Sequence, residues 1–289
     1  MNLRPLIVIA GPTATGKSAL AIKLANVING VIINADSRQI YKEMNIGTAR
    51  PSEKQMKQVP HFLYGSVSVK DSYNMYEYQK DVFKLLETIP KEQTPILVGG
   101  TGLYIDSVVY NYNLRSQNEV DEERRKKYSQ YSAEELQKRI PTEVLEKLNN
   151  SDKNNPRRLQ RIIERGNTLG NEKEKTNIFP HKYFVIDLPT DVLKMRIEKR
   201  VDEMLKNGLI EENRQIQEEG LNIYSPLDSI GYREFLGYFE NEKTIGDVRE
   251  EIINHSMQYV KRQRTWFKRN SDAIWTTEFD LILKESQTL

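Results

Sequence analysis

One loop, residues 11–18, constrains the fold of this chain more than any other segment. It reads GPTATGKS, follows the apolar run Leu6–Ala10 and precedes a helix-type segment at residues 19–25. A glycine-bracketed loop that ends in Lys and Ser, between a buried strand and a helix, is typical of a phosphate-binding loop. Its N–H groups and Lys17 attract an anion, and Ser18 is expected to bind Mg²⁺. The sequence predicts a diphosphate or triphosphate site and leaves open which of the two binds. The residues expected to contact the phosphates are Gly11, Pro12, Thr13, Ala14, Thr15, Gly16, Lys17 and Ser18.

Alternating strand and helix patterns in the first half of the chain predict an α/β fold with a parallel sheet. Apolar runs at residues 31–35 and 95–100 favour buried strands, and residues 76–88 favour a helix between them. Asp36 and Thr101 each lie at the end of one of these strands. Because ligands bind at the carboxyl ends of parallel strands, we expect both side chains to lie beside the phosphate-binding loop.

A change in composition after residue 112 predicts an insertion in this sheet. Residues 113–150 are highly charged, with apolar residues at helical spacing, and a strand pattern returns at residues 183–188. We therefore expect a core at residues 1–112 that resembles the P-loop NTPases and a mainly helical inserted domain at residues 113–150. Residues 151–289 are expected to return to the core and to add helical segments that bind RNA.

Cysteine is absent from the 289 residues, which excludes disulfide bonds and thiolate metal sites. The three histidines, His61, His181 and His255, lack the spacing of metal ligands and are expected to have structural roles. No apolar run approaches the length that crosses a membrane. We expect a cytoplasmic protein without a membrane partner. The net charge of +2 argues neither for nor against nucleic acid.

Two basic segments stand out from this nearly neutral background. In the first, Asn155 and Pro156 favour a helix start, and arginines recur every four residues on one face of residues 157–165. In the second, residues 259–269, cations alternate with aromatic rings. Guanidinium groups suit phosphates and rings stack on unpaired bases, but a solvated helix face with buried rings is the alternative. Beside a phosphate-binding loop, the two segments together favour RNA as a partner.

Seven short motifs occur in order from the first strand nearly to the end of the chain. They are residues 11–18, 36–41 (DSRQIY), 47–51 (GTARP), 99–104 (GGTGLY), 155–161 (NPRRLQR), 230–233 (IGYR) and 261–266 (KRQRTW). Together they resemble the tRNA dimethylallyltransferases, also called tRNA isopentenyl-diphosphate transferases, in their bacterial form. A phosphate-binding loop alone is compatible with many functions, whereas seven ordered motifs are specific.

The resemblance implies transfer of a dimethylallyl group from dimethylallyl diphosphate to an adenosine exocyclic amine. That adenosine lies on the 3′ side of the anticodon in tRNAs that read codons starting with U. The loop would then hold the prenyl diphosphate, with Mg²⁺ as the expected cofactor, and Arg233 would add a cationic clamp. The expected partners are the anticodon stem-loop of tRNA and dimethylallyl diphosphate, and we expect the protein to act as a monomer.

Asp36 is the expected general base of this reaction. It would accept a proton from the amine as the C–N bond forms, while Thr101 would bind a phosphate oxygen or orient the amine. A cap on the following helix is the alternative role for Asp36. The target base is stacked in its loop and has to be pulled out to reach the site. The residues expected to contact tRNA are Asp36, Ser37, Arg38, Gln39, Thr101, Arg157, Arg158, Leu159, Gln160 and Arg161.

Two other function classes stay open from the residues alone. A small-molecule kinase that uses ATP would share the loop and the sheet, and an RNA-binding NTPase would bind RNA without group transfer. Against a kinase, the strand that leads to Thr101 carries no terminal aspartate of the magnesium-binding kind. A kinase that acts on a small metabolite would also not need the two basic segments.

Overall fold

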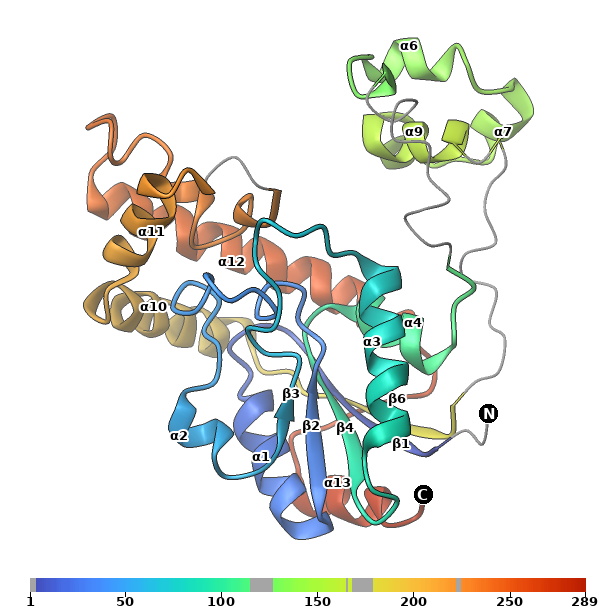
Figure 1. The fold of residues 1–289 in the computed structure, drawn as a ribbon, viewed down its shortest axis with the longest axis vertical. Coiled ribbons are helices and arrows are strands. Elements are labelled where there is room, and N and C mark those ends of the chain that lie inside the picture. The colour runs from blue at the N-terminus through green and yellow to red at the C-terminus, as the bar shows by residue number, and fades with distance from the viewer. Residues whose placement is uncertain (1–3, 115–126, 165, 168–178, 222–224) are drawn as a thin grey trace. The chain divides into compact units, whose positions relative to one another are not determined.

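Among the residues described, six parallel strands form one sheet in the order β3-β2-β4-β1-β5-β6. The computed structural model describes residues 4–114, 127–164, 166–167, 179–221 and 225–289. Ala10 pairs with Gly99 across β1 and β4, and Asn34 pairs with Val98 across β2 and β4. The carboxyl ends of these neighbouring strands therefore meet at one edge of the sheet (Figure 1). The strands are β1 (Leu6–Ala10), β2 (Gly30–Asn34), β3 (His61–Phe62), β4 (Thr94–Gly99), β5 (His181–Val185) and β6 (Ala273–Trp275).

The α/β fold with a parallel sheet is confirmed, and the strand bounds differ slightly from the apolar runs. The strand expected at residues 183–188 begins at His181 and ends at Val185. The apolar pattern runs on because Ile186 is buried too, and its N–H donates to the Ala10 carbonyl (2.8 Å) after the strand has ended. The two edge strands, β3 and β6, are two and three residues long, too short to give a clear alternating pattern.

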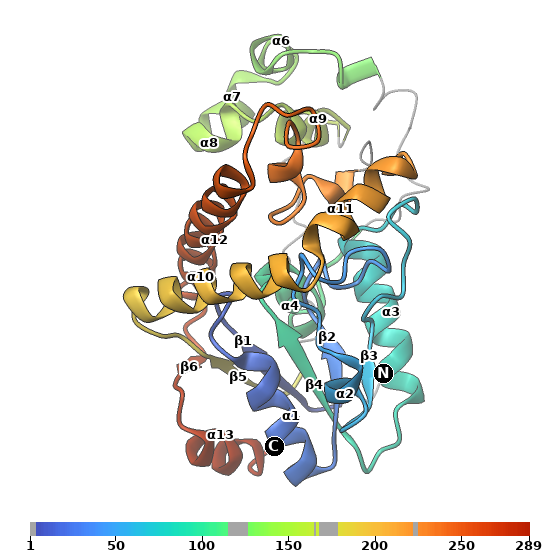
Figure 2. The same ribbon diagram turned by 90° about the vertical axis from the view of Figure 1, so that its left-hand side faces the viewer.

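Helices cover both faces of the sheet. Ala21 and Leu24 of α1 and Ile282 of α13 pack against Ile7 and Ile9 of β1 on one face. α3 and α4 lie on the other face (Figure 2), as right-handed crossovers require when the chain reverses its direction across the sheet after β3. The helices around the sheet are α1 (Lys17–Ile28), α2 (Glu53–Met56), α3 (Met75–Thr88), α4 (Gly102–Val109) and α13 (Phe279–Ser286).

A second apolar cluster joins α10 to α12 beyond the carboxyl edge of the sheet. α10 (Thr190–Lys206) contributes Leu193, Ile197 and Val201, the face that the sequence predicts. The helix α12 (Ile245–Phe267) contributes Val248 and Ile252 to the same cluster. Gly208 follows α10, as expected for a helix stop, and α11 (Leu209–Glu218) begins directly after it. These helices form one wall of the cleft described below.

Residues 110–177 form a compact unit of their own, separate from residues 1–109 and 178–289. Leu159, Ile162 and Ile163 pack against Leu136 and Ile140 in its core. The insertion expected at residues 113–150 is therefore shorter than this unit, because a boundary at residue 150 would separate the two sides of one apolar core. The described helices of the unit are α6 (Ala133–Gln137), α7 (Thr142–Glu146), α8 (Asn150–Lys153) and α9 (Pro156–Glu164).

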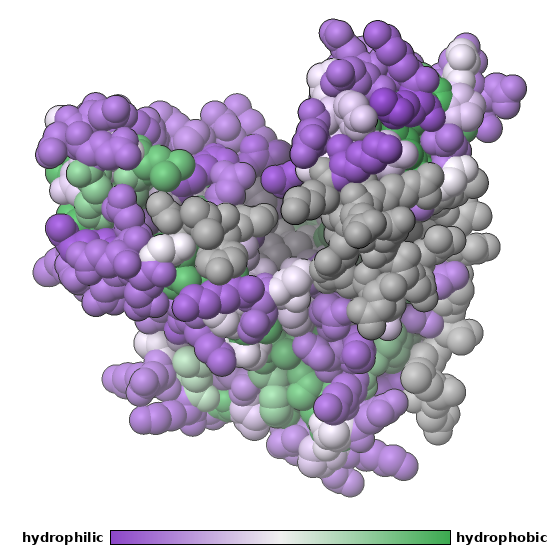
Figure 3. Space-filling model, turned by 45° about the horizontal axis from the view of Figure 1, so that its top comes forward, coloured by the Kyte–Doolittle hydropathy of each residue, from purple (hydrophilic) through white to green (hydrophobic). Residues whose placement is uncertain are grey.

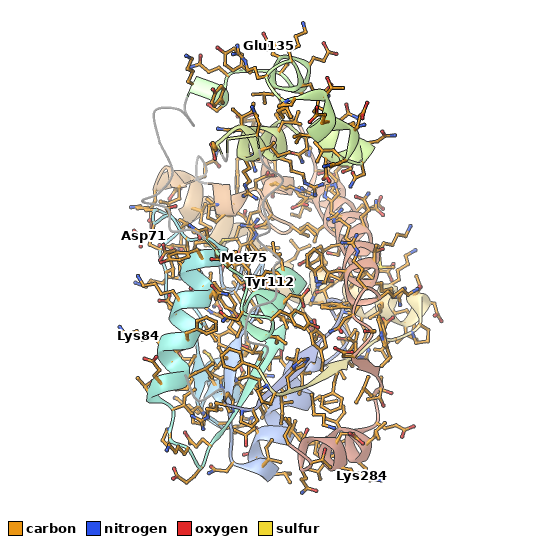
Figure 4. The ribbon with its side chains drawn as sticks, turned by 90° about the vertical axis from the view of Figure 1, so that its right-hand side faces the viewer. Asp71, Met75, Lys84, Tyr112, Glu135 and Lys284 are labelled. Atoms are coloured by element: carbon orange, nitrogen blue, oxygen red, sulfur yellow. The ribbon has the colours of Figure 1, made fainter. Side chains whose placement is uncertain are left out.

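Hydrophilic residues cover much of the coloured surface in Figure 3. Long charged side chains project from the helices, as Lys84 of α3 and Lys284 of α13 do in Figure 4. The large apolar side chains at the surface, such as Met195 and Leu236, come from separate elements. Among the described residues, no helix has the length and the apolar character needed to cross a membrane.

We predict that Gly11→Ala destabilises the protein by about 2–4 kcal/mol. Gly11 has a φ of 147°, and a Cβ there would lie 2.1 Å from the Ile186 carbonyl oxygen. Urea unfolding followed by circular dichroism measures the loss. Gly246→Ala is the matched control and should be neutral or slightly stabilising, because a Cβ at this helical position meets Thr244 Oγ1 at an ordinary 3.5 Å. Equal unfolding midpoints for both variants would contradict the prediction.

Candidate active site

The phosphate-binding loop is folded back by hydrogen bonds to one carbonyl. Thr15 Oγ1 and Lys17 Nζ both donate to the Pro12 carbonyl, at 2.9 and 3.0 Å. Gly16 has a φ of 92°, and no described side chain caps the N-terminus of α1. An uncapped helix N-terminus beside a lysine suits an anion. The structure brings together all the residues expected here: Gly11, Pro12, Thr13, Ala14, Thr15 and Gly16 form the turn, and Lys17 and Ser18 begin α1.

Two arginines of α10 lie beside this loop, and neither belongs to the motifs that indicate the site in the sequence. Arg200 Nη1 donates to Thr13 Oγ1 (2.7 Å), and Arg196 Nη1 donates to the Thr15 carbonyl (3.3 Å). Arg200 Nε is buried and has no hydrogen-bond partner among the described residues. Because such a donor costs free energy until it meets an acceptor, Arg200 is suited to an anionic ligand. Its signal in the sequence is the four-residue spacing from Arg196.

Burial makes the charged forms of two of these cations less favourable. Burial lowers the pKa of Lys17 to about 8, while the nearby Asp36 carboxylate acts in the opposite direction. Burial also lowers the pKa of Arg200 to about 10, again against the effect of Asp36. An anion bound between the two groups would favour their charged forms.

Asp36 and Thr101 lie close together, as the sequence predicts. Thr101 N–H donates to the Ala35 carbonyl (3.2 Å), and Thr101 Oγ1 accepts from Ser37 N–H (3.0 Å). Asp36 Oδ1 accepts from Arg38 N–H (2.9 Å), a cap on a turn rather than on a helix. Its Oδ2 accepts no hydrogen bond from the described residues. The hydrogen bond to Oδ1 therefore fixes the side chain, and Oδ2 is able to accept a hydrogen bond or a proton from a ligand.

A cleft of about 260 Å³ contains Asp36, Arg200 and Arg233 in its walls. Apolar side chains from α10 and α12 face the same space, so one cleft offers cations, a carboxylate and an apolar surface. Tyr259 was not predicted; it lines the cleft and shares a hydrogen bond with Thr101, and burial raises its pKa to about 12. The lining residues are Thr13, Asp36, Ser37, Arg38, Gly47, Thr48, Arg200, Val201, Met204, Asp228, Ser229, Ile230, Arg233, Ile252, Ser256, Tyr259 and Arg262.

Glu212 of α11 holds the loop that carries the GTARP motif. Its carboxylate accepts from the N–H groups of Ile46 (2.8 Å) and Gly47 (3.0 Å), and from the Tyr232 hydroxyl (2.7 Å). A Cβ at Gly47 would lie 2.7 Å from the Tyr232 ring. The loop and the IGYR turn therefore pack tightly against each other. Gln39, in the DSRQIY segment, also bonds to the loop by donating to the Thr48 carbonyl (3.0 Å).

Part of the second basic segment has a structural role. Arg264 forms a bidentate ion pair with Asp187, at 2.9 and 3.0 Å. Trp266 Nε1 donates to Asp106 Oδ2 (2.9 Å), and the Phe267 ring is fully buried. The alternative in which these rings belong to the core is confirmed for Phe267. Arg262, by contrast, lines the cleft.

The first basic segment forms α9, within residues 110–177. Asn155 Oδ1 accepts from Arg158 N–H (3.2 Å), so the predicted N-cap is present. The side chains of Arg157, Arg158 and Arg161 are exposed, and Arg158 pairs with Asp152. Leu159 and Gln160, which we expected to contact tRNA, have buried side chains. The exposed positive charges of this helix therefore come from these three arginines.

The described residues contain no group of three or more His, Cys, Asp and Glu side chains that could hold a metal ion. The residues present nevertheless fit Mg²⁺ in one respect. Mg²⁺ at phosphate sites takes few protein ligands and completes its shell with water and phosphate oxygens. The Ser18 hydroxyl, in the first turn of α1, is an oxygen ligand of the required kind.

Comparison with known proteins gives matches over most of the chain. A family model described as IPP transferase matches residues 39–270. A tRNA dimethylallyltransferase of Staphylococcus aureus is 35% identical, covering 96% of this chain and 94% of the relative. One of Clostridioides difficile is 36% identical, covering 97% of this chain and 93% of the relative.

Solved structures agree with these matches. A tRNA delta(2)-isopentenylpyrophosphate transferase of Staphylococcus epidermidis has a TM-score of 0.72 at 31% identity, covering 99% of this chain and 98% of the other. A eukaryotic dimethylallyltransferase acting on tRNA has a TM-score of 0.77 at 26% identity, covering 91% of this chain and 69% of the other.

We predict that affinity for inorganic pyrophosphate falls as the pH rises above about 8, where Lys17 loses its proton. Linkage gives a loss of about tenfold per pH unit. Titration calorimetry from pH 6.5 to 9.5 measures it. Lys17→Arg keeps its charge over this range, so the difference between the two proteins separates Lys17 from the ionisation of pyrophosphate itself. Parallel pH profiles for the two proteins would contradict the assignment.

Proposed function

The chain belongs to the IPP transferase family, and on that premise we propose that it transfers a dimethylallyl group from dimethylallyl diphosphate to tRNA. The acceptor is the exocyclic amine of the adenosine 3′ to the anticodon in tRNAs that read codons starting with U. One observation carries the proposal: a single cleft contains both Arg200, which is bonded to the phosphate-binding loop, and the carboxylate of Asp36.

The reaction forms a C–N bond and breaks a C–O bond. The amine nitrogen attacks C1 of the dimethylallyl group, and diphosphate leaves with the electrons of the C1–O bond. Lys17, Arg200 and the N-terminus of α1 stabilise the charge on the departing diphosphate. Asp36 Oδ2 accepts the amine proton, while its Oδ1 stays bonded to Arg38 N–H. Thr101 keeps Ser37 and Asp36 in place through the Ser37 N–H.

Mg²⁺ would neutralise phosphate charge, and Ser18 would hold it. Ser37, Arg38 and Gln39 would contact the target nucleotide near Asp36, and the exposed arginines of α9 would bind tRNA phosphates. We propose that the protein acts on tRNA in the cytoplasm. We propose that the enzyme acts as a monomer.

Mass spectrometry of the tRNA anticodon fragment, after incubation with dimethylallyl diphosphate and Mg²⁺, tests this function. We expect a mass increase of one dimethylallyl group on the adenosine, and Lys17→Ala should abolish it. An absolute requirement for ATP, or ATP hydrolysis at the rate of tRNA modification, would favour the kinase or NTPase alternatives and overturn the proposal.

Asp36→Asn should lower the single-turnover rate by about a hundredfold or more. The amide keeps the size of the side chain but cannot accept the proton as a carboxylate does. Binding of dimethylallyl diphosphate should hardly change. Asp202→Asn, which removes a surface carboxylate paired with Arg249, is the control with an unchanged rate. A normal rate for Asp36→Asn would mean that Asp36 only shapes the turn.

Replacing Arg157, Arg158 and Arg161 together by Gln should weaken tRNA binding and flatten its salt dependence. Each lost phosphate contact lowers the slope of log K against log salt by about 0.7–0.9. The control replaces Lys194, Lys199 and Lys206, exposed on α10, and removes the same charge. Equal losses in both triple variants would show a nonspecific charge effect and contradict the role of α9.

A further inference from the structure

We propose that Glu234 is a positioning residue that holds the Arg233 guanidinium in the cleft and thereby sets the affinity for the diphosphate group. This inference rests on the proposed function only in assigning a diphosphate to the cleft. It concerns a buried carboxylate that none of the sequence motifs singled out for a role.

Glu234 is fully buried, and its three partners among the described residues all donate hydrogen bonds to it. Its Oε2 accepts from Gly231 N–H (2.8 Å), and its Oε1 accepts from His255 Nδ1 (2.6 Å) and Arg233 Nε (3.3 Å). A buried carboxylate is costly unless it is paired and hydrogen-bonded. The two oxygens therefore have separate tasks: Oε2 closes the turn, and Oε1 faces the two side chains.

The Arg233 guanidinium is held at its Nε, and the edge formed by its two terminal nitrogens is available to a ligand. Its Nε is bonded to Glu234, while its terminal nitrogens make no hydrogen bond to the described residues. The side chain is 34% exposed and lines the cleft. A guanidinium binds phosphate oxygens through two parallel N–H groups, so a fixed Nε presets the direction of that planar edge. Without Glu234, the flexible Arg233 side chain would have to lose more rotamer freedom on binding.

The turn that carries Arg233 is fixed from several sides. Gly231, with a φ of 94°, donates its N–H to Glu234 and accepts from Asn213 Nδ2 (3.1 Å) at its carbonyl. Tyr232 is bonded to Glu212. His255 of α12 precedes Ser256, which lines the cleft. Glu234 thus connects the turn to α12 and the cation to the turn.

A double-mutant cycle separates positioning of Arg233 from simple support of the turn. The variants are Glu234→Gln, Arg233→Gln and the combination, and the measurement is the affinity for inorganic pyrophosphate and for dimethylallyl diphosphate without tRNA. We expect Glu234→Gln to weaken both by about tenfold in the wild-type background. In the Arg233→Gln background the same change should have little further effect, because the group it positions is gone.

Equal losses in both backgrounds would show that Glu234 acts through the turn alone and would overturn the proposal, as would unchanged affinity in the single variant. Glu251→Gln on α12, at a surface ion pair with Lys243, is the matched control with unchanged affinity. If Glu234→Gln does not fold, Glu234→Asp keeps the charge but withdraws the oxygens, and the same cycle applies. The cycle can be measured with pyrophosphate alone, without tRNA. If it shows the coupling but the wild-type protein does not modify tRNA, the proposed function is refuted and this inference is left intact.

Discussion

One glutamine side chain joins the elements on which the cleft depends. Gln263 Oε1 accepts from Thr13 N–H in the phosphate-binding loop, and Gln263 Nε2 donates to the Gly100 carbonyl, each at 2.9 Å. The residue is almost fully buried, so both hydrogen bonds form away from water, where an unpaired group is costly. The ends of β1 and β4 are therefore fixed against α12. The same helix carries Tyr259 and Arg262 into the cleft.

The cations of the phosphate-binding loop and of the cleft come from separate elements and were brought together by folding. Lys17 begins α1, Arg200 lies on α10, and Arg233 lies in the turn before α12. Fixed cations around a space for phosphate need little reorganisation when negative charge develops on a leaving group. Asp36 faces the same space from the end of β2, so the proposed proton acceptor and the proposed leaving-group site are adjacent without being paired directly.

Ambiguous sequence signals were decided by packing partners. The alternation of cations and rings at residues 259–269 was compatible with RNA binding or with a helix that packs on one side. Arg264 pairs with Asp187, and Trp266 donates to Asp106, both far away in the sequence. These contacts give Arg264 and Trp266 a structural role. On α9, in contrast, the four-residue spacing of the arginines already separated the exposed face from Leu159 and Ile162, because helix periodicity alone sets which residues share a face.

The sequence by itself determined the phosphate-binding loop, the parallel sheet and the meeting of Asp36 with Thr101. These follow from local patterns, since an apolar run fixes a strand and the strand's end fixes the residue after it. Only the tertiary structure decided the roles of Arg200, Gln263 and Glu234. Arg200 contacts Thr13 across 187 positions, and Gln263 contacts it across 250. Such contacts leave no periodic signal in one sequence, because they depend on how α10 and α12 pack against the sheet and not on the preferences of neighbouring residues.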